Sequence, residues 1–218
     1  EWAEDWLIDH YGNIYIETQE ILPPIELDKP KLKYLNPSIL EQYNYFHPYM
    51  FERGLNENII RKFHIGYNKE TDSITFPMWD IKGNLVGITE RSVKTKRFYV
   101  PEDLDKPVYL LNYIVKENID TVWVCESQIN TLLCWKRGRP AIGLIGTGSN
   151  PQYEILKKSG IRQYFLAFDG DEAGDKGRKR FIQNMSKDVL INIVNIPRGK
   201  DIADLSDNEF NNLTYYQI

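Results

Sequence analysis

The two halves of the chain carry different patterns of hydrophobic and polar positions. In the second half, short apolar runs alternate with segments in which apolar residues recur at helical spacing. The apolar runs are residues 121–125, 141–145, 163–168 and 189–196. Strands that alternate with helices indicate a parallel sheet with right-handed crossovers, and continuous apolar runs fit strands buried on both faces. We therefore predict an α/β fold with a Rossmann-like parallel sheet in residues 119–218.

The first half predicts a small mixed α+β subdomain over residues 37–118. Asn56 is placed to cap a short helix, and two strand-like segments flank the turn-like sequence IKGN as in a β-hairpin. The predicted elements are a helix at 57–63, strands at 73–80, 84–93 and 96–100, and a helix or turn at 108–118. Residues 1–36 are punctuated by prolines and are expected to form an extended lead-in or linker.

Composition narrows the classes of function. The chain of 218 residues has a net charge of −4, so any contact with nucleic acid must rely on local basic patches. The two cysteines form no CxxC pair, which excludes a disulfide scaffold and a cysteine-ligated zinc site, so we expect no zinc in this chain. No apolar run is long enough to span a membrane, and the low cysteine content favours a reduced setting, so we expect a cytoplasmic protein. The start at Glu1, without an initiator Met, suggests a piece of a longer protein.

Acidic or polar residues follow every predicted strand of the second half. They are Glu126, Thr147 with Gly148, Asp169 with Asp171, and Asp201 with Asp204. The carboxyl ends of parallel strands meet at one edge of a sheet, so we expect these side chains to converge there. Carboxylates this close repel each other, and hard oxygen donors favour Mg²⁺ or Mn²⁺ as the compensating charge. The simpler alternative is that each acid is a solvated turn residue or a helix cap, as Asp171 would be for a helix that starts near Glu172.

Phosphatases of the haloacid dehalogenase type also place an Asp-x-Asp pair after a strand. In that class the pair follows the first strand and a threonine comes soon after. Here Asp169 and Asp171 follow the third strand, and Glu126 precedes them. We therefore rank a phosphatase of this type below a protein whose acids, gathered from several strand ends, bind Mg²⁺ or Mn²⁺.

The segments that carry these residues resemble the TOPRIM domain of DnaG-type primases from bacteria and phages. They are VWVCES, IGTGSN, AFDGDEAG and PRGKDIADL. Upstream, RGLNENIIRKFHIGY, ITFPMWDIKGNLVGITERS and KRFYVPEDLDKPVYLLNY look like the N-terminal subdomain of the primase RNA-polymerase core, and the resemblance covers about residues 45 to 205. It implies a TOPRIM-type sheet preceded by an α+β subdomain, and synthesis of short RNA primers on single-stranded DNA by metal-dependent nucleotidyl transfer.

The resemblance also implies roles for individual residues. Catalysis would involve Glu126, Asp169 and Asp171, and metal binding would involve the same three residues with Asp201. Nucleotide or template binding would involve Arg53, Arg91, Lys96, Thr147 and Asn130, with weaker candidates in Asp204, Lys176 and Arg178. The implied partners are a single-stranded DNA template, ribonucleoside triphosphates and a replicative helicase reached through regions outside this chain.

Three positions depart from the family pattern. Ser127 stands where a glycine is usual, and Asn130 stands where an aspartate is usual, so one metal ion would be held less tightly. The closing pair is Asp-Ile-Ala-Asp, which puts the role of Asp204 in doubt. The basic helix segment KGRKR fits a phosphate-facing patch and a solvated outer face equally well.

Two other functions stay open at this point. A TOPRIM nuclease would share the acids without needing Arg53, Arg91 and Lys96. A non-catalytic nucleic-acid-binding module would fit Ser127 and Asn130, although the joint presence of Glu126, Asp169 and Asp171 speaks against it. A strand-passing topoisomerase would need a nucleophilic tyrosine on a further domain, for which this chain has no room.

Overall fold

The computed structural model describes residues 34–102, 104–185 and 189–218, and all of them belong to one compact unit. The predicted lead-in at 1–36 falls almost entirely on residues 1–33, which lie outside the described residues. No helix among the described residues is both long and apolar enough to cross a membrane.

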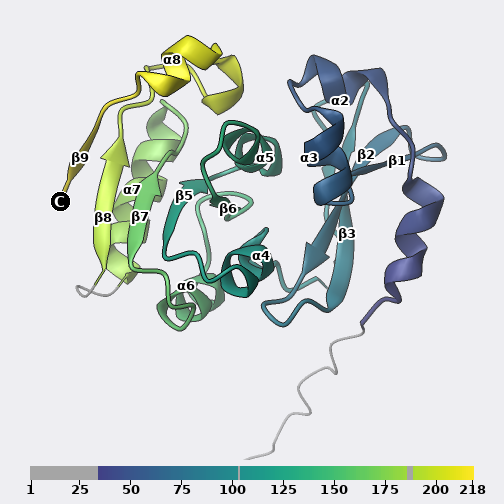
Figure 1. Cartoon of the computed structure of the whole chain (residues 1–218), viewed down its shortest axis with the longest axis horizontal. Helices are drawn as coiled ribbons and strands as arrows, with labels where there is room; N and C mark the ends of the chain where they lie inside the picture. Colours follow the sequence, from purple (N-terminus) through teal and green to yellow (C-terminus); the bar gives the residue numbers. More distant parts are fainter. Residues whose placement is uncertain (1–33, 103, 186–188) are drawn as a thin grey trace, which may run out of the picture. The chain divides into compact units, whose positions relative to one another are not determined.

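An antiparallel sheet forms the centre of the first half (Figure 1). Its strand order is β1-β2-β3-β4, and the described strands are β1 (Gly66–Asn68), β2 (Ser73–Trp79), β3 (Leu85–Ser92) and β4 (Phe98–Tyr99). Strands β2 and β3 form the predicted hairpin, with Ser73 opposite Ser92. The helical segments of this half are η1 (Pro37–Tyr43), α2 (Pro48–Glu52), α3 (Glu57–Lys62) and α4 (Leu111–Lys116). Asn56 caps α3 as predicted, because its Oδ1 accepts the backbone N–H of Ile59 at 3.0 Å.

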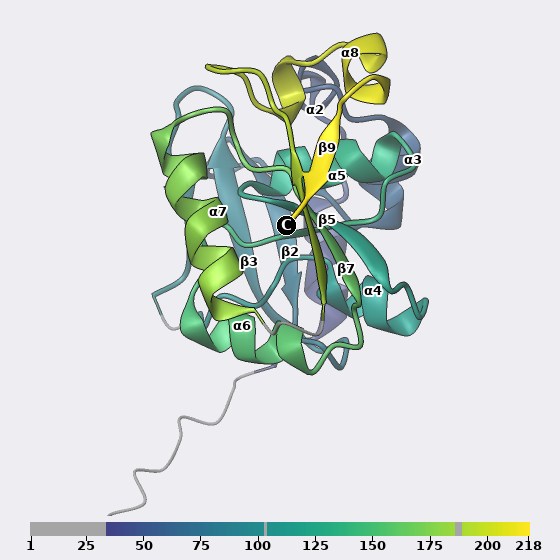
Figure 2. The same cartoon turned by 90° about the vertical axis from the view of Figure 1, so that its left-hand side faces the viewer.

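The second half contains the predicted α/β sheet (Figures 1 and 2). Its order is β6-β5-β7-β8-β9, and its strands are β5 (Thr121–Cys125), β6 (Ala141–Gly143), β7 (Gln163–Leu166), β8 (Leu190–Val194) and β9 (Tyr215–Gln217). The first four strands pair in parallel, as the sequence predicts. Strand β9 was not predicted, and it pairs antiparallel with β8 at the edge of the sheet. Its three residues are exposed, so they carry no run of buried apolar positions that the sequence could reveal.

Helices cover both faces of this second sheet. They are α5 (Gln128–Lys136), α6 (Asn150–Lys157), α7 (Glu172–Asn184), the short 3₁₀ segment η2 (Ile202–Asp204) and α8 (Asp207–Asn211). One face of the sheet packs against α4, α6 and α7 through a cluster that includes Val124, Leu166 and Phe181. The other face packs against α5, η2 and α8 through Cys125, Leu132 and Phe210. This two-sided cover explains why the strands are apolar along their whole length.

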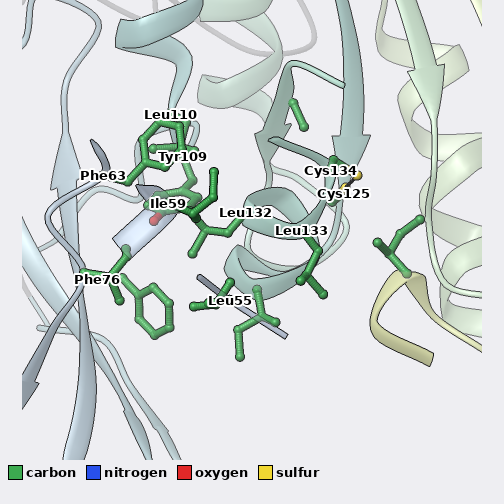
Figure 3. Packing of buried hydrophobic residues seen from close by; sticks show 14 of the residues in the cluster. Leu55, Ile59, Phe63, Phe76, Tyr109, Leu110, Cys125, Leu132, Leu133 and Cys134 are labelled. Carbon is green, nitrogen blue, oxygen red and sulfur yellow. Dashed lines mark hydrogen bonds between the residues drawn. The ribbon is translucent and has the colours of Figure 1, made fainter. Parts of the chain in front are cut away.

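Helix α5 also joins the two sheets. Every residue from Gln128 to Cys134 is buried, which is typical of a helix with protein on all sides. The same apolar cluster contains Leu132 and Leu133 of α5, Ile59 of α3 and Phe76 of β2 (Figure 3). The predicted domain boundary at residues 118 and 119 falls between α4 and β5, and it stays a prediction.

Candidate active site

Four carboxylates follow neighbouring parallel strands at the same edge of the second sheet. Glu126 follows β5, Asp169 and Asp171 follow β7, and Asp201 follows β8. Thr147 lies beyond β6, half-buried, and its carbonyl accepts the hydroxyl of Tyr153 at 2.8 Å. Since β5, β7 and β8 are adjacent and parallel, their ends place these acids along one rim. We call Glu126, Asp169, Asp171 and Asp201 the carboxylate rim.

Glu126 and Asp169 are in direct contact. Oε1 of Glu126 accepts the backbone N–H of Asp169 at 3.1 Å. Oδ1 of Asp169 accepts a hydrogen bond from Nδ2 of Asn130 at 3.2 Å. Ser127 caps α5 by accepting the N–H of Asn130 at 3.1 Å. Ser127 therefore starts the helix that carries Asn130 to the rim, so the two departures from the family pattern support one local structure.

The other two acids of the rim each cap a helical segment. Oδ1 of Asp171 accepts the N–H of Gly174 at 2.8 Å, at the start of α7. Oδ1 of Asp201 accepts the N–H groups of Ala203 and Asp204 at 2.7 and 3.1 Å, at the start of η2. The capping role that the sequence offered for Asp171 is therefore present, together with its place on the rim. Asp204 is exposed, and its Oδ2 accepts the N–H of Asp201 at 2.9 Å.

Burial and mutual repulsion raise the pKa of the acids at the centre of the rim. The pKa of Asp169 is raised to about 7, first by burial and then by the charges of Glu126, Asp201 and Asp171. Burial also raises the pKa of Glu126, while the N–H of Asp169 and the charge of Arg178 act in the opposite direction. Each shift reports that a negative charge is costly here. A bound cation would remove that cost.

The donor atoms of the rim suit a hard divalent cation, although they are not gathered as a finished metal site. No group of three or more His, Cys, Asp and Glu side chains that could hold a metal ion is found within the described residues. However, Oδ1 of Asn130 is buried beside Asp169 and finds no hydrogen-bond partner among them. Carboxylate and amide oxygens are the ligands that Mg²⁺ and Mn²⁺ prefer. The residues present therefore fit such an ion in chemistry, once the side chains turn toward it.

A cavity of about 280 Å³ opens beside Glu126. Its lining includes two cationic side chains, Arg91 and Lys106, and the aromatic rings of Phe76 and Phe98. Nε of Arg91 donates to the hydroxyl of Tyr49 at 3.3 Å, which fixes the guanidinium at the cavity wall. The cavity therefore combines an acid, two cations and apolar surface within one space.

The structure places the remaining predicted residues in different settings. Arg53 ends α2, is half-buried, and its Nε has no partner among the described residues. Lys96 is exposed between β3 and β4, and Lys176 is exposed on α7. Neither lysine lines the cavity beside Glu126. The side chain of Arg178 is only 13% exposed, and its guanidinium already binds Asp175 and two backbone carbonyls.

Two residues of the site region escaped the sequence reasoning. Lys106 lines the cavity, but it sits in an irregular segment with no periodic pattern to single it out. Gln128 lines the cavity too, and its buried amide donates to Oγ1 of Thr89 at 2.7 Å. This contact ties the start of α5 to β3. A polar residue at a helix start offers no sequence signal for such a partner.

Comparison with known proteins finds similarity in the second half and beyond it. Residues 123–206 match the Toprim-like family. An uncharacterised protein of Mycoplasma genitalium is 29% identical over 156 residues, which cover 66% of this chain and 70% of that protein. A DNA primase of Clostridium acetobutylicum is 25% identical over 177 residues, or 75% of this chain, but the match spans only 29% of the primase.

A solved structure shares the fold of the described residues. It is a DnaG primase catalytic domain bound to single-stranded DNA, with a TM-score of 0.63 and 18% sequence identity. The match covers 75% of this chain and 68% of that domain. It confirms the predicted fold, a Toprim-type sheet preceded by a smaller α+β subdomain.

Proposed function

We propose that the chain is the catalytic core of a DNA primase, because residues 123–206 match the Toprim-like family and DNA primases are among the similar proteins. It would synthesise short RNA primers on single-stranded DNA by nucleotidyl transfer. The chain spans only about a third of the length of the primases it matches, so the activity of a whole primase comes to it as part of this proposal.

The position of Glu126 is the observation that carries the proposal. Glu126 contacts Asp169 on the carboxylate rim and at the same time lines the cavity that holds Arg91 and Lys106. Nucleotidyl transfer needs acidic oxygens beside cationic side chains, because a triphosphate must be held while its charge is compensated. A nuclease needs the acids alone. The cavity therefore favours polymerisation over cleavage.

Each group of residues has a defined task in this proposal. Glu126, Asp169, Asp171 and Asp201 would hold Mg²⁺ or Mn²⁺, which when bound lowers the charge on the triphosphate and orients the attacking 3′-hydroxyl. Arg91 and Lys106 would bind the phosphates of the incoming ribonucleotide. Burial raises the pKa of Glu126, which makes its carboxylate a stronger base toward the attacking hydroxyl than an exposed glutamate would be.

Template binding rests on more exposed groups. We assign Arg53 and Lys96 to the phosphates of the template. We assign Thr147 and Asn130, which lie beside the carboxylate rim, to binding of the incoming nucleotide. Lys176 and Asp204, both exposed, stay secondary candidates. The proposed partners are single-stranded DNA, ribonucleoside triphosphates and, through regions outside this chain, a replicative helicase in the cytoplasm. The solved primase domain bound to single-stranded DNA supports the first of these partners.

The test is incubation of the chain with single-stranded DNA, labelled ribonucleotides and Mg²⁺ or Mn²⁺. Labelled oligomers are expected from the wild type. Glu126→Gln should abolish them while leaving template binding nearly intact, since binding rests on cations. Glu154→Gln, which removes a surface ion pair with Lys157 on α6, is the matched control and should keep full yield. Shortened template without labelled oligomers would indicate a nuclease instead. If neither oligomers nor shortened template appear, the chain would be a non-catalytic binding module.

A further inference from the structure

Two loops carry the aspartates of the carboxylate rim, and their backbones pair with each other. The β7–α7 loop contains Asp169 to Asp171, and the β8–η2 loop contains residues 195–201. The N–H of Gly170 donates to the carbonyl of Lys200 at 2.9 Å, and the N–H of Gly199 donates to the carbonyl of Gly170 at 2.8 Å. A Cβ on Gly170 would lie 2.1 Å from the carbonyl oxygen of Pro197. The close approach of the two loops therefore requires a glycine here.

A chain of ion pairs links the same loops beside the backbone pairing. Oδ1 of Asp175, in the first turns of α7, binds Nη2 of Arg178 at 2.6 Å. Oδ2 of Asp175 binds Nη1 of Arg198 at 2.8 Å. Because Arg178 belongs to α7 and Arg198 to the β8–η2 loop, one carboxylate connects the helix to the second loop. We call Asp175, Arg178 and Arg198 the loop clamp.

The inner end of the loop clamp reaches the backbone that carries Asp169. Nη1 of Arg178 donates to the carbonyl of Phe168 at 3.0 Å, and both Nη atoms lie 3.4 Å from the carbonyl of Asp169. The Arg178 side chain is 13% exposed, whereas Arg198 is 67% exposed. A planar guanidinium can span a carboxylate and two carbonyls at once, which a lysine cannot do. Arg178 is thus a fixed anchor, and Arg198 is the peripheral end of the clamp.

We propose that Asp175, Arg178 and Arg198 are positioning residues that hold the two aspartate-bearing loops at the spacing a divalent cation needs. The proposal rests on the proposed function, because it concerns the metal of that same site. Asp169 and Asp171 come from one loop and Asp201 from the other, and their like charges push the loops apart. A clamp that resists this separation keeps the donors pre-organised, so less free energy is spent on gathering them when the ion binds. None of the three clamp residues has to touch the ion.

Direct measurement of Mn²⁺ affinity by electron paramagnetic resonance of the free ion tests this proposal. Asp175→Asn and Arg198→Met should each weaken Mn²⁺ binding by about tenfold, the lower end of what outer partners of metal ligands contribute. The double variant should lose little more than either single variant, because both changes break the same bridge. Glu154→Gln is the control for loss of an exposed ion pair and should bind Mn²⁺ as the wild type does.

A second readout needs no metal. Amide hydrogen exchange at Gly170 and Gly199, followed by NMR in metal-free buffer, should be faster in Asp175→Asn and Arg198→Met than in the wild type. A merely structural role would lower the melting temperature and leave Mn²⁺ affinity and these two amides unchanged below the transition. That result, or strictly additive losses of Mn²⁺ affinity in the double variant, would overturn the positioning role and leave the proposed function standing. A wild-type chain that binds no Mn²⁺ would overturn the proposed function together with this inference.

Discussion

Asp169 is the residue on which most of the local electrostatics converge. It contacts Glu126 through its backbone N–H, takes a hydrogen bond from Asn130, and has a pKa raised to about 7. Asn130 contributes a neutral donor where a second carboxylate would add more repulsion. The carboxylates of the rim attract a cation, and the neutral amide of Asn130 keeps their mutual repulsion lower in the metal-free folded state.

The raised pKa of Asp169 makes stability depend on pH. In metal-free buffer, the folded state keeps the proton on Asp169 up to about pH 7, whereas the unfolded chain releases it near the ordinary value of 3.8. The folded state binds more protons between these limits, so the free energy of unfolding should fall as pH rises from about 4 to about 7. Asp169→Asn should remove this part of the fall, as measured by urea unfolding at several pH values.

Asp120→Asn is the matched control for that series. Asp120 is exposed and precedes β5, so it lies at the amino ends of the strands, away from the carboxylate rim at their carboxyl ends. Its variant should follow the pH profile of the wild type. Parallel profiles for the wild type and Asp169→Asn would show that Asp169 does not carry a raised pKa.

Metal should stabilise the chain through the same carboxylates. Mg²⁺ or Mn²⁺ binds the folded state and relieves the repulsion within the rim, so the melting temperature should rise with metal concentration. Asp169→Asn combined with Asp171→Asn should abolish this rise, as followed by circular dichroism. An undiminished rise in the double variant would place the metal elsewhere.

At the scale of elements, strand ends and loops decide where the acids meet. The strands that the sequence predicts are present, and so is the convergence of Glu126, Asp169 and Asp201 at one edge, because parallel topology follows from alternating strands and helices. The pairing of Gly170 with Lys200 could not be predicted, since it joins two loops far apart in sequence. Lys106 and β9 were missed for the same reason: their roles depend on tertiary contacts and not on periodicity.

Gly170→Ala tests the fit between the two loops. A methyl group would meet the carbonyl of Pro197, so the loops must separate. We expect a loss of roughly 1–3 kcal/mol of stability, as for other overpacked sites, together with weaker Mn²⁺ binding. Urea unfolding and a Mn²⁺ titration measure the two effects. Glu172→Ala, at an exposed position two residues further on, is the control and should change neither strongly.

At the scale of the whole molecule, charge sets the limits of nucleic-acid binding. The chain carries a net charge of −4, so its contacts with template phosphates must come from local cationic side chains such as Arg53 and Lys96. We expect single-stranded DNA to bind in the micromolar range or more weakly, roughly as sequence-independent electrostatic contacts do. Binding should weaken steeply with salt and differ little between template sequences.

Fluorescence anisotropy on several oligonucleotides at two salt concentrations measures this binding. Arg53→Ala and Lys96→Ala should lower affinity and make the salt dependence shallower, because each removes a contact with a template phosphate. Lys157→Ala, on α6, is the cationic control and should leave the slope unchanged. Tight, salt-insensitive and sequence-selective binding would mean that the chain reads bases.

The burial of α5 has a consequence for how this architecture can be inherited. Gln128 reaches across to Thr89, and Leu133 packs beside Gly54, while the opposite side of the helix covers β5. A substitution in α5 therefore changes its packing against both sheets at the same time. The two halves must change in step, and a gene fusion or deletion cannot exchange one of them freely. A relative that keeps the second sheet without the first should show polar side chains at the positions of Ile129 and Leu133.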